Sequence, residues 1–233
     1  ALAGKTALIT GASRGIGAAI ARRLHAAGMN VALASRSGDD LGLSGVVAQP
    51  CDVRSLADLQ AITDAAVARF GGLDVAVVNA GVGSYGEFLD LPVEELDEII
   101  DVNVKGTLHA TKAALPHLLR SNAADLLVVA SVAGQRGPEG ESVYAASKFA
   151  QVGFVRALDH ELWPKGVRCQ ILCPGGVATD FAMGRGRTPD DPDLANFMTA
   201  DEVGAVAVDL LRLPRSQRII ESTLLPMAED SLG

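Results

Sequence analysis

The sequence has no excess of basic residues, and this limits the partners of the protein. Its 20 lysines and arginines are outnumbered by 28 aspartates and glutamates, and the formal net charge is −8 at pH 7. Proteins that bind nucleic acids or anionic membrane surfaces usually carry a basic patch or a basic amphipathic helix. We therefore expect no nucleic acid and no membrane among its partners.

Cysteine and long apolar runs are scarce as well. The three cysteines, Cys51, Cys169 and Cys173, form no disulfide framework and show no metal-ligand spacing. We interpret them as small buried hydrophobic residues and expect no metal site. No apolar run approaches the roughly 18 residues of a membrane span, and the first residues do not have the pattern of a signal peptide. These absences together indicate a reducing, cytoplasmic setting.

What the sequence does have is 48% hydrophobic residues in a chain of 233, which is enough for the core of one domain. Short apolar runs alternate with segments of helical periodicity, and this alternation predicts parallel strands joined by helices. We expect strands at residues 6–10, 31–35, 46–49, 75–78, 126–130, 167–172 and 219–220. We expect helices at residues 15–27, 56–69, 142–162 and from 200 onward, with a long helix that opens at Pro92 and is limited or kinked by Pro116. The predicted α/β fold is a single domain over residues 1–233, a Rossmann-like, doubly wound parallel sheet with helices on both faces.

One segment, residues 175–197, is irregular and rich in Gly, Pro, Asp and Arg. A loop of this length inside a compact domain is usually functional, so we expect a lid over a substrate site. Arg185 and Arg187 in this segment fit either contact with an anionic substrate or a solvated loop.

A glycine-rich turn, Thr10-Gly-Ala-Ser-Arg-Gly-Ile-Gly17, lies between the first predicted strand and the first predicted helix. Gly11 permits a tight turn, and Gly15 and Gly17 allow the backbone to approach a pyrophosphate and the helix to pack close to the sheet. The start of the helix offers free N–H groups and a positive dipole end to phosphates. The spacing differs from the general G-x-G-x-x-G fingerprint, and the alternative is a turn that only connects two elements.

This turn resembles the T-G-x-x-x-G-x-G cofactor turn of the short-chain dehydrogenase/reductase family, and the resemblance extends over about the first four-fifths of the chain. Asn79-Ala-Gly81 matches the N-A-G element that stabilises the sheet beside the cofactor. Asp52 matches an aspartate that contacts the adenine. Pro174-Gly175 and Thr179 match the element that holds the nicotinamide carboxamide.

The resemblance implies a nicotinamide dinucleotide site. Its residues are Gly11, Ser13, Arg14, Gly15, Ile16, Gly17, Ser35, Arg36, Asp52, Val53, Asn79, Ala80, Gly81, Tyr144, Lys148, Pro174, Gly175, Val177 and Thr179. NAD-binding proteins place an acidic residue at the end of the second strand, where this chain has Ser35. Because the guanidinium groups of Arg36 and Arg14 suit a 2′-phosphate, NADP(H) is the preferred cofactor. NAD(H) stays possible if both arginines are merely solvated.

The stretch between Arg36 and Asp52 is too short and too Gly-rich for a full crossover helix. We therefore expect the adenosine end of the cofactor to be exposed.

Four further residues match the catalytic set of the family. Tyr144 and Lys148 are four residues apart and share one helix face. A phenol has a reference pKa near 10, and lowering it to about 7 takes roughly 4 kcal/mol, which a neighbouring ammonium and an oxidised nicotinamide can supply. Ser131 ends the fifth predicted strand, and Asn103 matches the residue that kinks its helix and holds a water leading to the lysine. A Tyr-x-x-x-Lys pair alone has the alternative of a solvated helix face.

The resemblance implies an NADP(H)-dependent oxidoreductase that transfers a hydride between nicotinamide and a carbonyl or secondary alcohol of a small-molecule substrate. In reduction, Ser131 polarises the carbonyl oxygen, Tyr144 protonates it, and Lys148 lowers the pKa of Tyr144 and binds the nicotinamide ribose. Asn103 and water resupply the proton. The alternative is a non-catalytic dinucleotide-binding regulatory protein on the same fold.

The end of the chain and its helices carry two weaker indications. Residues 219–227 resemble the ending of family members that act on 3-hydroxy acids or related small alcohols, and the Gly-rich tail of fatty-acid-type 3-oxoacyl reductases is absent. The helices that carry Asn103 and Tyr144 are rich in apolar residues, some of which should stay exposed in a single chain. The family packs these two helices against a second subunit, which implies a homodimer or a homotetramer.

Overall fold

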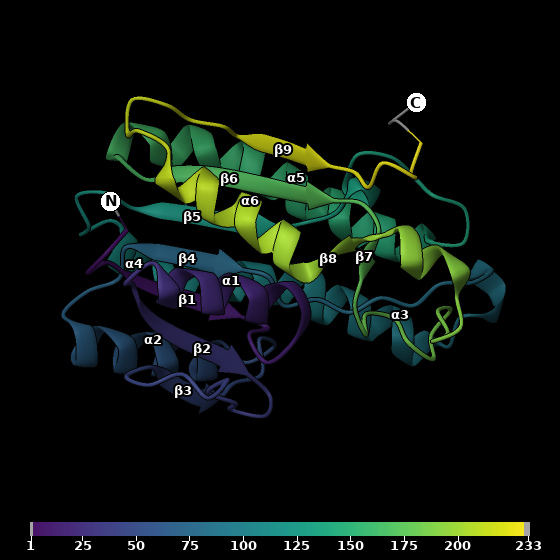
Figure 1. Cartoon of the computed structure of the whole chain (residues 1–233), viewed down its shortest axis with the longest axis horizontal. Helices are drawn as coiled ribbons and strands as arrows, with labels where there is room; N and C mark the ends of the chain where they lie inside the picture. Colours follow the sequence, from purple (N-terminus) through teal and green to yellow (C-terminus); the bar gives the residue numbers. More distant parts are fainter. Residues whose placement is uncertain (1, 231–233) are drawn as a thin grey trace.

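The computed structural model describes residues 2–230, and a seven-stranded sheet forms its centre (Figure 1). The strand order is β3-β2-β1-β4-β5-β6-β9, and every neighbouring pair is parallel. The strands are β1 Thr6–Thr10, β2 Asn30–Ser35, β3 Val47–Pro50, β4 Val75–Val78, β5 Asp125–Val129, β6 Arg168–Pro174 and β9 Glu221–Leu224. The order reverses between β1 and β4, and doubly wound sheets bind ligands at the carboxyl ends of the strands at such a point.

Helices cover both faces of this sheet, which confirms the predicted fold class. Their bounds are α1 Gly15–Ala26, α2 Leu56–Phe70, α3 Val93–Ile99, α4 Gly106–Leu118, α5 Ser142–Leu162 and α6 Ala200–Arg212. Helices α1 and α6 pack together in front of the sheet in Figure 1, and α2, α4 and α5 cover the face behind it. No helix of residues 2–230 has both the length and the apolar character needed to cross a membrane.

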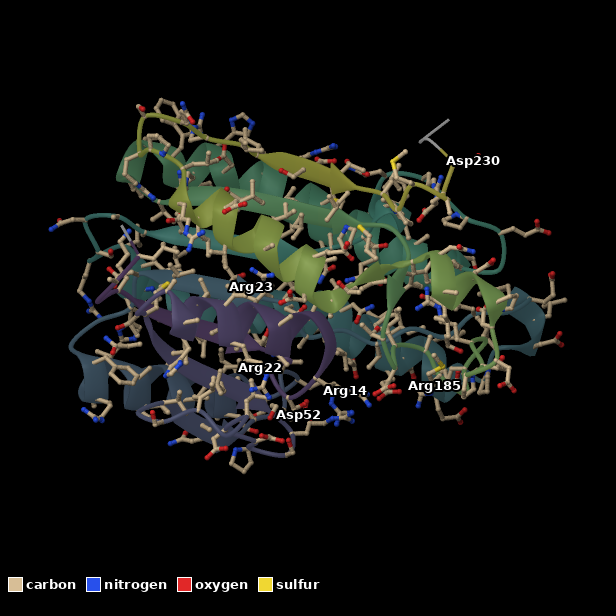
Figure 2. All side chains as sticks on the ribbon, viewed as in Figure 1. Arg14, Arg22, Arg23, Asp52, Arg185 and Asp230 are labelled. Carbon is tan, nitrogen blue, oxygen red and sulfur yellow. The ribbon has the colours of Figure 1, made fainter. Side chains whose placement is uncertain are left out.

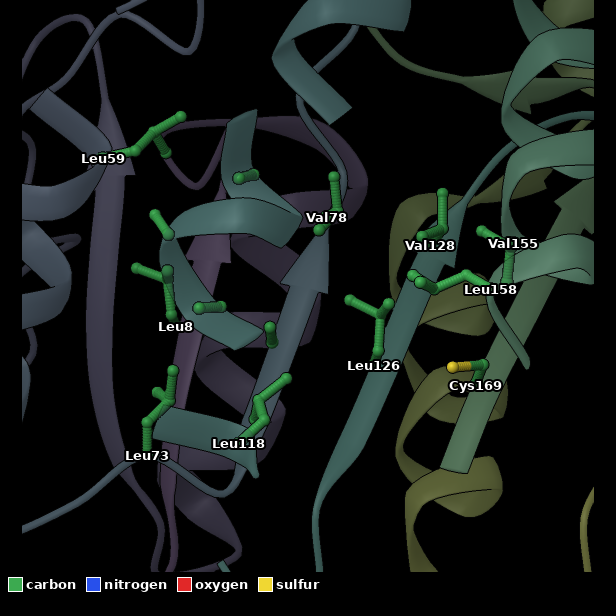
Figure 3. Packing of buried hydrophobic residues seen from close by; sticks show 14 of the residues in the cluster. Leu8, Leu59, Leu73, Val78, Leu118, Leu126, Val128, Val155, Leu158 and Cys169 are labelled. Atoms are coloured by element: carbon green, nitrogen blue, oxygen red, sulfur yellow. The ribbon is translucent and has the colours of Figure 1, made fainter. Parts of the chain in front are cut away.

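The alternation of side chains along each strand builds two cores. In β5, Leu126 and Val128 join the core under α2, α4 and α5, whereas Leu127 and Val129 join the core under α1 and α6. Figure 3 shows the first of these cores, where Leu126 and Val128 lie near Val155 and Leu158 of α5. Cys51, Cys169 and Cys173 are free and buried in this same core, as their interpretation as small hydrophobic residues predicts. Burial raises the pKa of the Cys169 thiol to about 12, so this thiol stays protonated and unreactive.

Local signals of the sequence place the helix ends. The Ser55 side chain accepts a hydrogen bond from the Asp58 N–H at the start of α2, and Gly71 ends that helix in the left-handed conformation with φ 89°. A capping box between Thr199 and Glu202 starts α6. The segment between Arg36 and β3 forms no helix, as its composition predicts.

Two predicted elements need correction. The last strand, β9, is Glu221–Leu224, and the predicted Ile219 and Ile220 lie just before it. The Ile220 carbonyl accepts a hydrogen bond from Ile171 N at 2.7 Å, so pairing with β6 begins beside these residues and continues beyond them. The predicted long helix is interrupted by a π-helical turn, η2 Ile100–Lys105, between α3 and α4. Pro116 lies inside α4, which ends two residues later at Leu118.

Residues 175–197 are more ordered than their composition predicts. They contain the short strand β7 Val177–Ala178, which pairs with β8 Met198–Thr199 just beyond the segment, and a 3-10 helix, η5 Pro192–Asn196. Ala182 adopts a φ of 59°, which is unusual for a residue other than glycine. The 3-10 helices η1 Phe88–Asp90, η3 Val132–Gly134 and η4 Trp163–Lys165 complete the elements.

Candidate active site

A cavity of about 650 Å³ opens at the carboxyl ends of the strands. Its walls are the turn between β1 and α1, the ends of β2, β4, β5 and β6, one side of α5, and part of residues 175–197. This size falls in the range of small-molecule and cofactor sites. The cavity therefore occupies the position that the strand order predicts for a ligand.

The glycine-rich turn forms one end of this cavity. Gly11 has a φ of 65°, and a Cβ there would lie 2.8 Å from the Ala80 Cα, so only glycine fits. The Asn79 side-chain amide donates to the carbonyls of Thr10 at 3.1 Å and Gly11 at 3.3 Å. The Thr10 hydroxyl accepts the N–H groups of Asn79 and Ala80. Asn79 thus holds the turn against the end of β4, as the N-A-G element implies.

Gly17 serves packing rather than contact with the cavity. A Cβ on Gly17 would clash with the Gly11 carbonyl oxygen and with the Asn79 amide, and Gly17 does not line the cavity. Its lack of a side chain therefore allows α1 to start directly behind the turn. The prediction that Gly17 contacts the cofactor stays a prediction.

The start of α1 fits a phosphate. Its N-cap residue, Arg14, makes no side-chain capping bond, whereas α2 and α6 are both capped by side chains. The first N–H groups of a helix have no partner within it, and together with the helix dipole they favour an anion. Ser13, Arg14, Gly15 and Ile16 all line the cavity at this point. The turn is therefore suited to the pyrophosphate of a dinucleotide.

The end of β2 forms the part of the cavity where the resemblance places the adenosine ribose. Ser35 is buried and its hydroxyl lies 3.2 Å from the Ser37 hydroxyl, while Arg14 and Arg36 are exposed. All four residues line the cavity. Asp52 lines it as well, and Arg14 and Asp52 appear at this end of the molecule in Figure 2.

The predicted adenine contact, Asp52, has a partner that the sequence did not indicate. The Arg54 guanidinium pairs with the Asp52 carboxylate at 2.5 Å, and this hydrogen bond holds the pKa of Asp52 below its ordinary value. Arg54 also lines the cavity. Asp52 therefore stays ionised and is fixed in place by a neighbouring cation.

The proposed catalytic side chains meet at the other end of the cavity. Ser131 lies just after β5 as the N-cap of η3, and its hydroxyl accepts the Ala133 N–H at 3.1 Å. Tyr144 and Lys148 both lie on α5 and are buried, with the Lys148 Nζ 5.5 Å from the centre of the Tyr144 ring. All three residues line the cavity. The structure thus brings together the residues that the pattern predicts.

Burial controls the protonation of this pair. It raises the pKa of the Tyr144 phenol, while a hydrogen bond with Ser131 opposes that rise. Among the protein groups, desolvation outweighs the nearby charges, and the expected lowering of the Tyr144 pKa by Lys148 together with a bound oxidised nicotinamide stays a prediction. Burial also lowers the pKa of Lys148 to about 8, so its ammonium form still predominates at neutral pH. A protonated phenol beside an ammonium is the state from which a proton can be donated.

Asn103 lies behind the cavity rather than in its wall. It is fully buried, and its side chain exchanges two hydrogen bonds with the backbone of Val82 at 2.8 and 2.9 Å. The π-helical turn that contains it turns the Asn103 carbonyl toward α5, where it accepts the Gln151 amide at 3.0 Å. The assignment of Asn103 to proton resupply stays a prediction.

Gln151 is a residue that sequence reasoning missed. Its side-chain oxygen accepts the Lys148 Nζ–H at 2.9 Å, so one buried amide links Lys148 to Asn103 directly. The spacing of three residues from Lys148 on one helix was the available signal. Two aromatic residues were also missed: the rings of Tyr85 and Phe181 lie 5.7 and 5.6 Å from the Tyr144 ring. Both come from loops, where no periodicity indicates contact.

Comparison with known proteins identifies the family of the chain. The short chain dehydrogenase family matches residues 5–190. The chain belongs to the short-chain dehydrogenase family. An oxidoreductase of Salmonella typhimurium, UcpA, is 41% identical over 203 residues, which cover 82% of this chain and 77% of that protein.

The solved structures of one dehydrogenase and one reductase superpose closely on this short-chain dehydrogenase. An alcohol dehydrogenase from Thermococcus sibiricus, complexed with 5-hydroxy-NADP, has a TM-score of 0.87 and 33% identity, covering 97% of this chain and 98% of the other. A 3-ketoacyl-(acyl-carrier-protein) reductase from Brucella melitensis, complexed with NADH, has a TM-score of 0.84 and 27% identity, covering 97% and 99%. The prediction of an oxidoreductase of this family is confirmed. The preference between NADP(H) and NAD(H) stays a prediction, because these two structures hold different cofactors.

Within residues 2–230, no group of three or more His, Cys, Asp or Glu side chains is placed to hold a metal ion.

Proposed function

We propose that this short-chain dehydrogenase uses NADP(H) to interconvert a carbonyl compound and a secondary alcohol, with Tyr144 as the proton donor and acceptor. The observation that carries the proposal is the meeting of Ser131, Tyr144 and Lys148 at one end of a cavity whose other end is the glycine-rich turn. A nicotinamide dinucleotide bound there supplies or accepts the hydride. A purely regulatory protein on this fold has no need of the three residues in this arrangement.

The roles of the side chains follow from their positions. The Ser131 hydroxyl lies where it can donate a hydrogen bond to the substrate oxygen as negative charge develops there. The Tyr144 phenol holds the proton that this oxygen receives. The Lys148 ammonium, held by Gln151, stabilises the phenolate that Tyr144 becomes. Gln151 accepts an N–H of Lys148 and donates to the Asn103 carbonyl, so these two residues position the ammonium, and water replaces its proton.

The test of this proposal is a nicotinamide absorbance assay in both directions. Ketones, 3-oxo esters and diketones are offered with NADPH, and secondary alcohols and 3-hydroxy acids are offered with NADP+. Turnover of at least one class supports the proposal, and NADPH binding without turnover of any class favours the regulatory alternative.

We expect the protein to assemble as a homodimer or a homotetramer. On the segment from η2 through α5, Ile100, Leu108 and Phe149 remain 37%, 40% and 47% exposed, as the predicted surplus of apolar residues requires. Burial of such a surface between subunits is favourable. Light scattering at micromolar concentration should give a mass of at least two chains of 24.0 kDa. A mass of one chain would contradict the prediction.

We also propose that residues 175–197 act as a lid over the substrate. Gly175, Val177, Thr179, Phe181 and Phe197 of this segment line the cavity. Closure of the segment over a bound dinucleotide would exclude water from hydride transfer. We expect hydrogen exchange of its amides to slow when NADPH is added. Exchange that is already slow and does not change with NADPH would contradict the proposed lid.

The cytoplasmic location of the protein also stays a prediction.

A further inference from the structure

Two arginines of the proposed lid differ in their surroundings. Arg185 pairs with the Glu98 carboxylate at 2.6 Å, and its carbonyl accepts the Tyr85 N–H at 2.9 Å. Arg187 lines the catalytic cavity, and no carboxylate of residues 2–230 lies within ion-pair distance of it. The sequence left both arginines open between substrate contact and solvation. The structure separates them, because Arg185 is occupied by a partner and Arg187 is not.

The position of Arg187 is held by aromatic contacts. Its guanidinium carbon lies 5.8 Å from the centre of the Tyr85 ring and 5.1 Å from that of the Phe197 ring. One guanidinium N–H group donates to the Val177 carbonyl at 3.3 Å. Gly186 has a φ of 99° and packs so closely on Tyr85 that a Cβ would clash. The side chain is therefore preorganised, while most of its N–H donors have no acceptor among these residues.

Arg187 also lies near the reacting end of the cavity. The Tyr85 ring that it covers meets the Tyr144 ring edge-on at 5.7 Å. The positive charge of Arg187 opposes the rise that burial causes in the pKa of Tyr144. A substrate whose carbonyl oxygen is at Tyr144 would thus extend past Tyr85 toward this guanidinium.

Two carboxylates that line the cavity, those of Glu141 and Asp180, have no ion-pair partner within residues 2–230. Arg136 and Glu229 pair with each other. Burial raises the pKa of the Glu141 carboxyl group. The charge of Glu229 raises this pKa further, and the charges of Arg187 and Arg136 lower it. A bound anion would be attracted by Arg187 and repelled by an ionised Glu141. The two side chains should therefore act in opposite directions on an anionic substrate.

We propose that Arg187 binds a carboxylate of the substrate, so that this dehydrogenase acts on oxo acids and the corresponding hydroxy acids in preference to neutral carbonyl compounds. The planar fork of a guanidinium matches the two oxygens of a carboxylate. The partly buried aromatic rings of Tyr85 and Phe197 lower the local dielectric and strengthen the interaction. This proposal rests on the proposed function, since it names the substrate class of the same site.

The experiment compares acids with their methyl esters. NADPH-linked reduction is measured for 2-oxobutanoate, 4-oxopentanoate and 5-oxohexanoate and for the three esters, which keep the carbonyl and lose the charge. We expect at least a tenfold higher kcat/KM for the acid at one chain length. Arg187→Met should lower that value at least tenfold and leave the ester within about twofold, and Glu141→Gln should raise the value for the acid.

Arg185→Met is the matched control, because it removes the same charge two residues away from a side chain that already has a carboxylate partner. Its effect should be equal on acid and ester. The NADPH dissociation constant of each variant is measured by cofactor fluorescence. Equal losses for acid and ester in Arg187→Met would show a packing role, and a weakened affinity for NADPH would show a cofactor contact; either result overturns the proposal.

A binding measurement separates this proposal from the proposed function. Calorimetric titration of the protein with pentanoate and with pentanamide, in the presence of NADP+, requires no turnover. Binding of pentanoate that Arg187→Met abolishes supports the anion site even if no carbonyl compound is reduced. If neutral ketones are reduced as well as acids and pentanoate does not bind, the proposed oxidoreductase function stands and the proposed anion site is wrong.

Discussion

Replacing Tyr144 with Phe should reduce turnover at least about 100-fold, the typical contribution of a lost acid–base group. The phenyl ring keeps the contacts with Tyr85 and Phe181, at 5.7 and 5.6 Å between ring centres, so the cavity should keep its shape. What is lost is the hydroxyl that donates the proton. Steady-state assays at saturating NADPH and substrate measure the effect, and the dissociation constant of NADPH should change by no more than about twofold.

The neighbouring tyrosine offers a matched control for this substitution. Tyr85→Phe also removes one tyrosine hydroxyl from a residue that lines the same cavity, and it keeps the ring. Because the mechanism gives that hydroxyl no proton to transfer, its loss should cost less than about tenfold. If Tyr144→Phe retained turnover within tenfold of the unmodified protein, or if the two variants were equally impaired, Tyr144 would not be the proton donor.

The unmodified protein should prefer NADPH to NADH by at least tenfold in kcat/KM, a difference of about 1.4 kcal/mol. The physical reason is the end of β2, where Ser35 carries no charge and Arg36 and Arg14 present exposed guanidinium groups to the cavity. A 2′-phosphate can pair with these groups, and no acidic side chain stands at the matching position to repel it. The double variant Ser35→Asp with Arg36→Ala should reverse the preference.

A control for the loss of a positive charge comes from α1. Arg22 is exposed, its one side-chain hydrogen bond among residues 2–230 goes to the Leu41 carbonyl at 3.0 Å, and it does not line the cavity. Arg22→Ala should therefore leave the ratio of the kcat/KM values for NADPH and NADH unchanged. Figure 2 shows Arg22, which lies within α1, apart from Arg14 at the start of that helix. Equal use of both cofactors by the unmodified protein would show that Ser35 and Arg36 do not read the phosphate.

Much of the fold could be predicted because its signals are local. The bounds predicted for α5 agree with Ser142–Leu162, and Ser55, Gly71 and Thr199, which are residue types common at helix ends, cap α2 and α6. Strands buried on both faces give continuous apolar runs, which are easy to recognise. The last strand was misplaced because Ile219 and Ile220 are β-branched apolar residues of the kind common in strands. The residues that pair with β6 include polar ones, Glu221 and Ser222.

The site was predicted as a set of residues and not as a set of contacts. Each predicted catalytic and cofactor residue lines the cavity except Gly17 and Asn103, which lie behind it. The hydrogen bonds from Lys148 through Gln151 to Asn103 depend on a π-helical turn at Asn103. Such a turn does not change the apolar periodicity of the sequence enough to be recognised. In the same way, the difference between Arg185 and Arg187 depends on which of two loop side chains reaches Glu98.

The bond between Glu229 and the loop after β6 has a consequence for the order of assembly. The Glu229 carboxylate accepts the Gly176 N–H at 2.8 Å and pairs with Arg136, so it closes one wall of the cavity. Gly176 leaves the ribosome 53 residues before its partner does. Chains fold progressively from the N-terminus as they emerge. The glycine-rich turn and the Tyr144 helix can therefore be in place on a nascent chain whose substrate end is still open, and this wall of the pocket closes only once Glu229 has been translated.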